Sequence, residues 1–105
     1  MSDPLHSEQC AGKLAALGAP ERLRIVGLLC GGAMNVTEMA AALATNHVNL
    51  AHHLGVLRQA GLVERTRRGR FIYYALVGGV RGAATPGGAA HCLDLGCCRL
   101  EFPAE

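Results

Sequence analysis

Two amphipathic helical patterns, separated by a three-residue linker, occupy the centre of this 105-residue chain. Residues 37–43 predict a short helix of about two turns with apolar side chains along one side. Residues 47–60 predict a longer helix, because leucines recur there at spacings of four and three, as Leu50, Leu54 and Leu57. The remaining faces of the longer helix carry amide and imidazole side chains, so one face is apolar and the others can form hydrogen bonds.

Further elements flank this helix pair. Residues 7–17 and 20–30 each predict a helix, the second with Pro20 in its first turn, where a missing backbone N–H is tolerated. Residues 62–66 and 71–76 predict strands joined by a basic tip, Arg67-Arg68-Gly69-Arg70. This order predicts an α+β fold, mainly α: a winged helix-turn-helix with four N-terminal helices and a β-hairpin wing. The second helix of such a pair enters the major groove of double-stranded DNA.

Basic charge is concentrated in one part of the chain. The formal net charge is +2, yet five arginines lie between Arg58 and Arg70, where Glu64 is the only acidic residue. Such a patch is typical of a surface that meets a polyanion, most often nucleic acid, although a solvated arginine-rich loop has the same composition.

The sequence also indicates the cellular compartment of the protein. No apolar run approaches the roughly 20 residues that span a bilayer, and the N-terminus lacks the pattern of a signal peptide. We therefore expect a cytoplasmic protein without a membrane partner. An odd number of cysteines, five, indicates thiols, metal ligands or a redox switch rather than a disulfide framework.

The composition changes after residue 77. Residues 78–88 are rich in glycine, which disfavours a helix and predicts a flexible linker over residues 78–90. We expect a winged-helix domain over residues 1–77 and a cysteine-rich sensing tail over residues 91–105.

The tail gathers potential metal ligands within eight residues, namely Cys92, Cys97, Cys98 and His91. Three thiolates suit a pyramidal As(III) or Sb(III) centre, and a turn at Gly96 could bring them together. With His91 the set becomes Cys3His, which suits Zn(II), Cd(II) or Pb(II). Two alternatives stay open: a redox or persulfide switch that uses these cysteines or Cys10, and small buried side chains in a final strand over residues 97–102.

Four stretches together resemble the ArsR/SmtB family of metal-responsive repressors: residues 17–25, 36–40, 53–63 and 68–74. The resemblance implies a homodimer that represses transcription and leaves an inverted-repeat operator when an inducer binds. It also implies that the recognition helix begins at Asn46 or His47. Cys10 would lie on a helix at the dimer interface, where it could add a ligand to the tail of the other subunit.

The resemblance assigns the DNA-facing residues by position. Those expected to face the groove are Asn46, His47, Asn49 and His52, the last standing where the family often has arginine. His53 is expected to pack or to bond a phosphate. The expected phosphate contacts are Arg58, Arg65, Arg67, Arg68 and Arg70.

The chain departs from the family at both of its known metal sites. The Cys-Val-Cys box of the family's third helix is replaced by Asn35-Val36-Thr37, and the glycine-rich linker stands in place of a C-terminal helix. We therefore expect As(III) or Sb(III), bound at the tail, to be the inducer. We expect no organic cofactor and no enzymatic activity, because the one candidate pair, Cys92 beside His91, lies on a glycine-flanked tail rather than in a rigid cleft.

Overall fold

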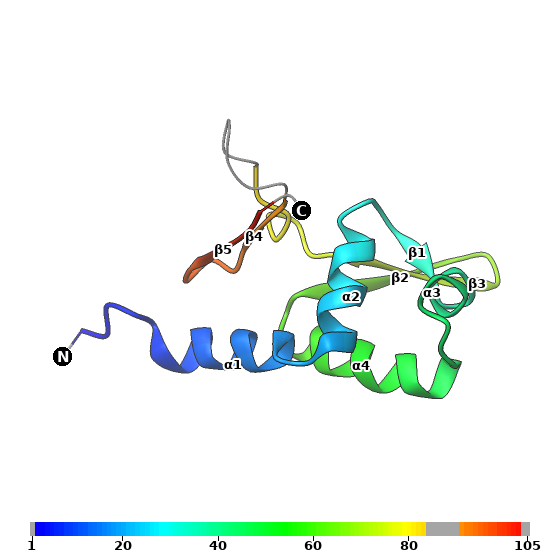
Figure 1. The fold of residues 1–105 in the computed structure, drawn as a ribbon, viewed down its shortest axis with the longest axis horizontal. Coiled ribbons are helices and arrows are strands. Elements are labelled where there is room, and N and C mark those ends of the chain that lie inside the picture. The colour runs from blue at the N-terminus through cyan, green and yellow to red at the C-terminus, as the bar shows by residue number, and fades with distance from the viewer. Residues whose placement is uncertain (1, 84–90, 104–105) are drawn as a thin grey trace.

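The computed structural model describes residues 2–83 and 91–103, which form four helices and five strands (Figure 1). The predicted winged helix-turn-helix is confirmed, with each helix within one residue of its predicted limits. The helices are α1 (Ser7–Leu17), α2 (Pro20–Leu29), α3 (Val36–Leu43) and α4 (His47–Gln59). None of the helices in these residues is long and apolar enough to cross a membrane.

Side chains at the helix starts explain where α3 and α4 begin. Asn35 forms a capping box with Glu38: its Oδ1 accepts from the Glu38 N–H at 2.8 Å, and Glu38 Oε1 accepts from the Asn35 N–H at 2.9 Å. Asn46 caps α4 by accepting from the Asn49 N–H at 2.7 Å. Between them, Ala44 takes a left-handed conformation, with φ 52°, that turns the chain sharply. These contacts define the helix-turn-helix linker.

The Asn35 cap gives the first testable prediction. Replacing Asn35 with alanine is expected to lower the free energy of unfolding by about 1 kcal/mol, because the N–H groups of the first turn lose their acceptor. Urea denaturation followed by circular dichroism measures this. Thr37→Ala, at an exposed position of the same turn, is the control and should change stability by less than about 0.5 kcal/mol. Equal effects of the two substitutions would contradict the capping role.

The wing is the hairpin of β2 (Val63–Arg68) and β3 (Phe71–Leu76), paired antiparallel from Val63 with Leu76 to Arg68 with Phe71. β3 has its predicted limits, whereas β2 runs two residues further toward the basic tip than predicted, because Gly69, with φ 62°, makes the turn tight. A two-residue strand, β1 (Met34–Asn35), pairs with the other edge of β3. β1 was not predicted, since two residues show no periodicity.

The core lies between the helices and the wing. The leucine stripe of α4 is buried as predicted, with exposed fractions of 0–1%. It packs against side chains of every other helix in one continuous cluster, among them Leu17, Ile25 and Met39. The polar faces of α4 therefore point outward.

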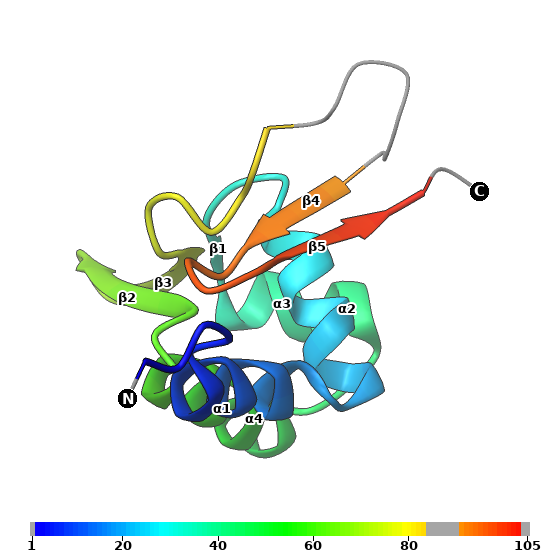
Figure 2. The same ribbon diagram turned by 90° about the vertical axis from the view of Figure 1, so that its left-hand side faces the viewer.

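The described part of the tail is a second antiparallel hairpin, β4 (His91–Asp94) and β5 (Arg99–Phe102). Figures 1 and 2 show it beside α2, with its turn above α1. Leu93 and Leu95 join the helical core, and Val80 of the glycine-rich segment is buried with them. The Gly82 N–H donates to Cys92 O and the Asp94 N–H to Val80 O. Residues 84–90 of the predicted linker lie outside the described residues.

Candidate functional site

The outer face of α4 presents the residues predicted to meet the groove. Asn46, His47, Asn49 and His52 are all exposed. The two asparagines also hold the helix start, since Asn46 caps it and Asn49 Nδ2 donates to Thr45 Oγ1 at 3.0 Å. Val48, between them, is 83% exposed. Val48 was not among the predicted DNA-facing residues, although it is an apolar residue off the leucine stripe. Its methyl groups suit a thymine methyl.

His53 has a different environment from its neighbours on α4. It is half-buried, and its Nδ1 lies 3.2 Å from Arg22 Nη1. Arg22 Nε in turn donates to Ala16 O at the end of α1. This chain of contacts connects α4 to the junction of α1 and α2, with the half-buried His53 ring against Arg22 of α2.

The arginines of the wing are all exposed, namely Arg65, Arg67, Arg68 and Arg70. Arg58, near the end of α4, is exposed as well. Arg68 lies over the Tyr73 ring and Arg70 over the Phe71 ring, with the guanidinium carbons 5.0 Å and 5.5 Å from the ring centres. Arg67 Nε donates to Gly69 O at 3.0 Å. These contacts orient three of the charges at the hairpin tip without neutralising them.

A second group of functional side chains joins the tail to α1. The sulfur atoms of Cys10, Cys97 and Cys98 all lie within 4.8 Å of one another. Cys10 and Cys97 form a disulfide although they are 87 residues apart, and Cys98 Sγ lies 3.9 Å from Cys97 Sγ. Cys10 is buried in α1, while the other two are half-buried.

The turn that presents Cys97 and Cys98 is held by several polar contacts. Gly96 has a φ of 85°, and its N–H donates to Asp94 Oδ1 at 2.9 Å. The Leu95 N–H donates to Cys98 O, closing the turn. Lys13 of α1 donates from Nζ to Leu95 O at 2.7 Å, which ties the same turn to the helix that carries Cys10.

The predicted ligand set needs a correction at Cys92 and His91. Cys92 is buried on β4 and is not part of the cluster; its Sγ accepts from Arg99 Nη2 at 3.1 Å. This hydrogen bond raises the pKa of the Arg99 guanidinium above its ordinary value. Gly82 leaves the room for that sulfur, since a Cβ there would lie 2.8 Å from it. His91 is exposed at the far end of β4. The turn at Gly96 directs Cys97 and Cys98 toward α1 instead, where Cys10 of the same chain meets them.

The fifth cysteine, Cys30, lies at the end of α2 with its side chain in the core. Burial raises the pKa of the Cys30 thiol, an effect that the charge of Arg81 partly opposes. Cys30 is therefore a core thiol whose protonated form is favoured by burial.

These elements define the winged helix-turn-helix class of proteins. A family model described as a helix-turn-helix domain matches residues 17–66. NmtR, an HTH-type transcriptional regulator of Mycobacterium tuberculosis, is 42% identical over 78 residues, which cover 71% of this chain and 65% of NmtR.

Two solved structures are similar as well. The homodimeric winged helix-turn-helix domain of Mb0332 from Mycobacterium bovis, a possible ArsR-family regulator, is 34% identical, with a TM-score of 0.67 and 74% of each chain covered. A possible transcriptional regulator for arsenical resistance is 38% identical, with a TM-score of 0.60 and 63% of this chain and 69% of that chain covered. The chain belongs to the ArsR/SmtB family of transcriptional regulators.

Proposed function

We propose that this chain is a homodimeric, DNA-binding transcriptional repressor that leaves an inverted-repeat operator when As(III) binds Cys10, Cys97 and Cys98. The observation that carries the proposal is the convergence of three cysteine sulfurs from α1 and the tail within 4.8 Å. Family membership, and the likeness to a possible transcriptional regulator for arsenical resistance, support it.

The DNA-binding half of the proposal rests on α4 and the wing. The exposed asparagine and histidine side chains at the start of α4 can contact base edges in the major groove. The exposed arginines of the wing can contact phosphates, which supply affinity and salt dependence rather than sequence choice.

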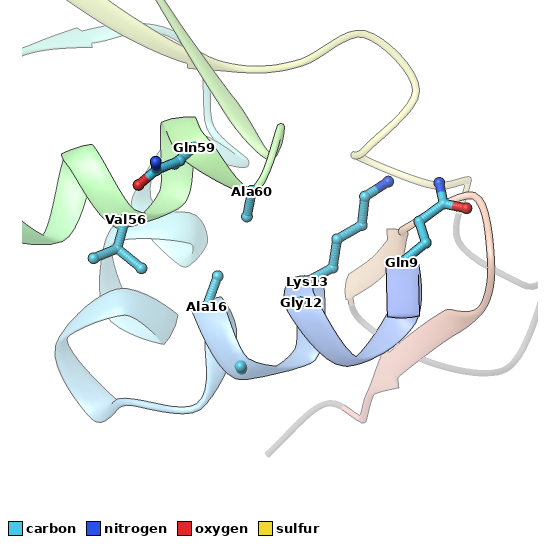
Figure 3. A pocket seen from close by; sticks show the side chains of 8 residues that line it. Gln9, Gly12, Lys13, Ala16, Val56, Gln59 and Ala60 are labelled. Atoms are coloured by element: carbon cyan, nitrogen blue, oxygen red, sulfur yellow. The ribbon is translucent and has the colours of Figure 1, made fainter. Parts of the chain in front are cut away.

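The homodimer is supported by the surface of α1. Leu14 on this helix is 43% exposed. An open hollow of about 490 Å³ lies between α1 and α4, and four of its eight lining residues are glycine or alanine. Figure 3 shows Gly12, Ala16 and Ala60 among them. An exposed leucine and an open hollow on the same helix suit a partner subunit, and a similar domain is homodimeric. Twofold symmetry then requires two half-sites about one helical turn apart.

The three thiols suit As(III) better than Zn(II). Arsenous acid reacts with three thiols to give a tris-thiolate and three water molecules, without any change of oxidation state, and the arsenic lone pair occupies the fourth direction. Among the described residues, no histidine, carboxylate or fourth thiol joins the three sulfurs, whereas Zn(II) needs four ligands. Binding requires the Cys10–Cys97 disulfide to be reduced first. The ion would then cross-link α1 and the tail.

The disulfide itself favours a second candidate function, a thiol switch. A two-electron oxidant such as hydrogen peroxide converts the Cys10 and Cys97 thiols into the disulfide and is reduced to two water molecules. The two candidates differ in one residue: the tris-thiolate needs Cys98, and the disulfide does not.

The experiment follows from that difference. Affinity for an inverted-repeat promoter fragment is measured by fluorescence anisotropy on reduced protein, before and after As(III) or peroxide. For the wild type we expect As(III) to lower the affinity about 5–150-fold, the usual range of such coupling. Cys98→Ser should abolish this response, as should Cys10→Ser. Cys30→Ala, the control at the core thiol, should retain it.

The response to peroxide distinguishes the As(III) sensor from the thiol switch. Release by peroxide that survives in Cys98→Ser but not in Cys10→Ser identifies the thiol switch. An As(III) response that survives in both Cys10→Ser and Cys98→Ser would overturn the proposed site. If the protein binds the inverted-repeat fragment no more tightly than unrelated DNA at equal salt, the proposed operator is wrong.

A further inference from the structure

A hollow of about 330 Å³ lies between α2 and the tail hairpin, and none of the three cysteines of the thiol cluster lines it. Its lining is almost entirely apolar and comes from both elements: Leu23, Val26 and Cys30 from α2, and Leu93 and Phe102 from the hairpin. Figure 2 shows the two elements side by side. The volume is at the small end of the range of ligand pockets, about 300–1,000 Å³.

One lining residue of the hollow, Arg24 of α2, bears a formal charge. The imidazole of His91 on β4 also lines it, and both residues are exposed. Leu23, beside Arg24, is 41% exposed. An apolar interior with an exposed guanidinium among its lining residues is complementary to a small molecule that has an apolar body and one anionic group.

We propose that this hollow is a binding site for a small apolar carboxylate. The apolar body would lie against Leu93, Phe102 and Val26, and the carboxylate would meet Arg24 and His91. The site is distinct from the thiol cluster and does not depend on the proposed response to As(III).

The position of the hollow gives such a ligand a regulatory consequence. One wall is the hairpin β4–β5, and the same hairpin carries Cys97 and Cys98 at its turn. A ligand that contacts both α2 and the hairpin stabilises the docked tail, because it binds only when both walls are in place.

The test uses octanoate as the probe and isothermal titration calorimetry on the reduced full chain. Octanoate is expected to bind at one site per chain, while octan-1-ol and acetate, which lack the charge or the apolar body, bind at least tenfold more weakly. Gly27 lies on α2 at the hollow, and nothing lies within 4 Å of a Cβ added there. The Cβ of a residue placed there meets no neighbour, so Gly27→Leu is expected to extend its side chain into the hollow and to weaken octanoate binding at least tenfold.

Gly55→Leu is the matched control. Gly55 is also helical and exposed, has the same open space around an added Cβ, and does not line the hollow. This variant should bind octanoate like the wild type. Arg24→Gln should weaken octanoate binding without changing the binding of octan-1-ol.

The proposal is overturned if octanoate does not bind, if Gly27→Leu and Gly55→Leu bind it equally, or if octan-1-ol binds as tightly. It is overturned also if sedimentation shows that Gly27→Leu dissociates a dimer, because the hollow would then hold a second copy of the chain.

Discussion

Replacing Leu54 with alanine is expected to lower the free energy of unfolding by about 2–5 kcal/mol. Leu54 is fully buried at the centre of the leucine stripe of α4, within the cluster that joins all four helices. Truncation removes its contacts and leaves a cavity that close-packed neighbours fill only in part. The loss is a large share of the total stability of a domain of this size, typically about 5–15 kcal/mol.

Urea denaturation followed by circular dichroism measures this loss, with both proteins at one concentration because a dimer unfolds in a concentration-dependent way. Val48→Ala, on the same helix at a position 83% exposed, is the control and should change stability by less than about 0.5 kcal/mol. A loss below about 1 kcal/mol for Leu54→Ala would mean that α4 does not pack as described.

The double substitution Arg65→Gln/Arg67→Gln is expected to weaken operator binding on the order of 100-fold near 50 mM salt. Both arginines are exposed on β2, and alternation along the strand places them on the same face. If each contacts one phosphate, a dimer loses four contacts. The slope of log affinity against log salt should then become shallower by about 3–4, at roughly 0.9 per contact.

Anisotropy titrations over a range of salt concentrations measure both quantities. Arg99→Gln removes the same charge from the tail hairpin, and its salt slope should match that of the wild type. If the double variant loses affinity with an unchanged slope, the wing does not contact phosphates. A changed preference between operator sequences would instead assign these arginines to base contacts.

The cluster of Cys10, Cys97 and Cys98 could be predicted only in part from the sequence. Clustering in the tail pointed to Cys97 and Cys98, and these do lie together. Cys92 belongs to the same short stretch, yet it pairs with Arg99. The family resemblance offered Cys10 only as a possible extra ligand to the tail of the other subunit, and the structure brings it to the tail of its own chain. Closeness along the chain therefore identified two of the three sulfurs.

The tail hairpin illustrates the same limit. A glycine-rich segment predicts flexibility, and nothing local indicates that Val80, Leu93 and Leu95 are buried in the helical core. Their burial depends on an apolar surface of the helices that exists only after these have packed together. The hollow that we assign to a carboxylate arises in the same way, because one wall comes from α2 and the other from the hairpin.

The sequence by itself determined the four helices, the helix-turn-helix, the wing and the exposed polar face of α4. These depend on apolar spacing, caps and turns, all of which act between residues close along the chain. Only the tertiary structure decided that Cys10 joins Cys97 and Cys98, that Cys92 does not, and that the tail closes an apolar hollow. The contact between α1 and the tail spans 87 residues of separation, and no local pattern encodes the packing of two elements so far apart.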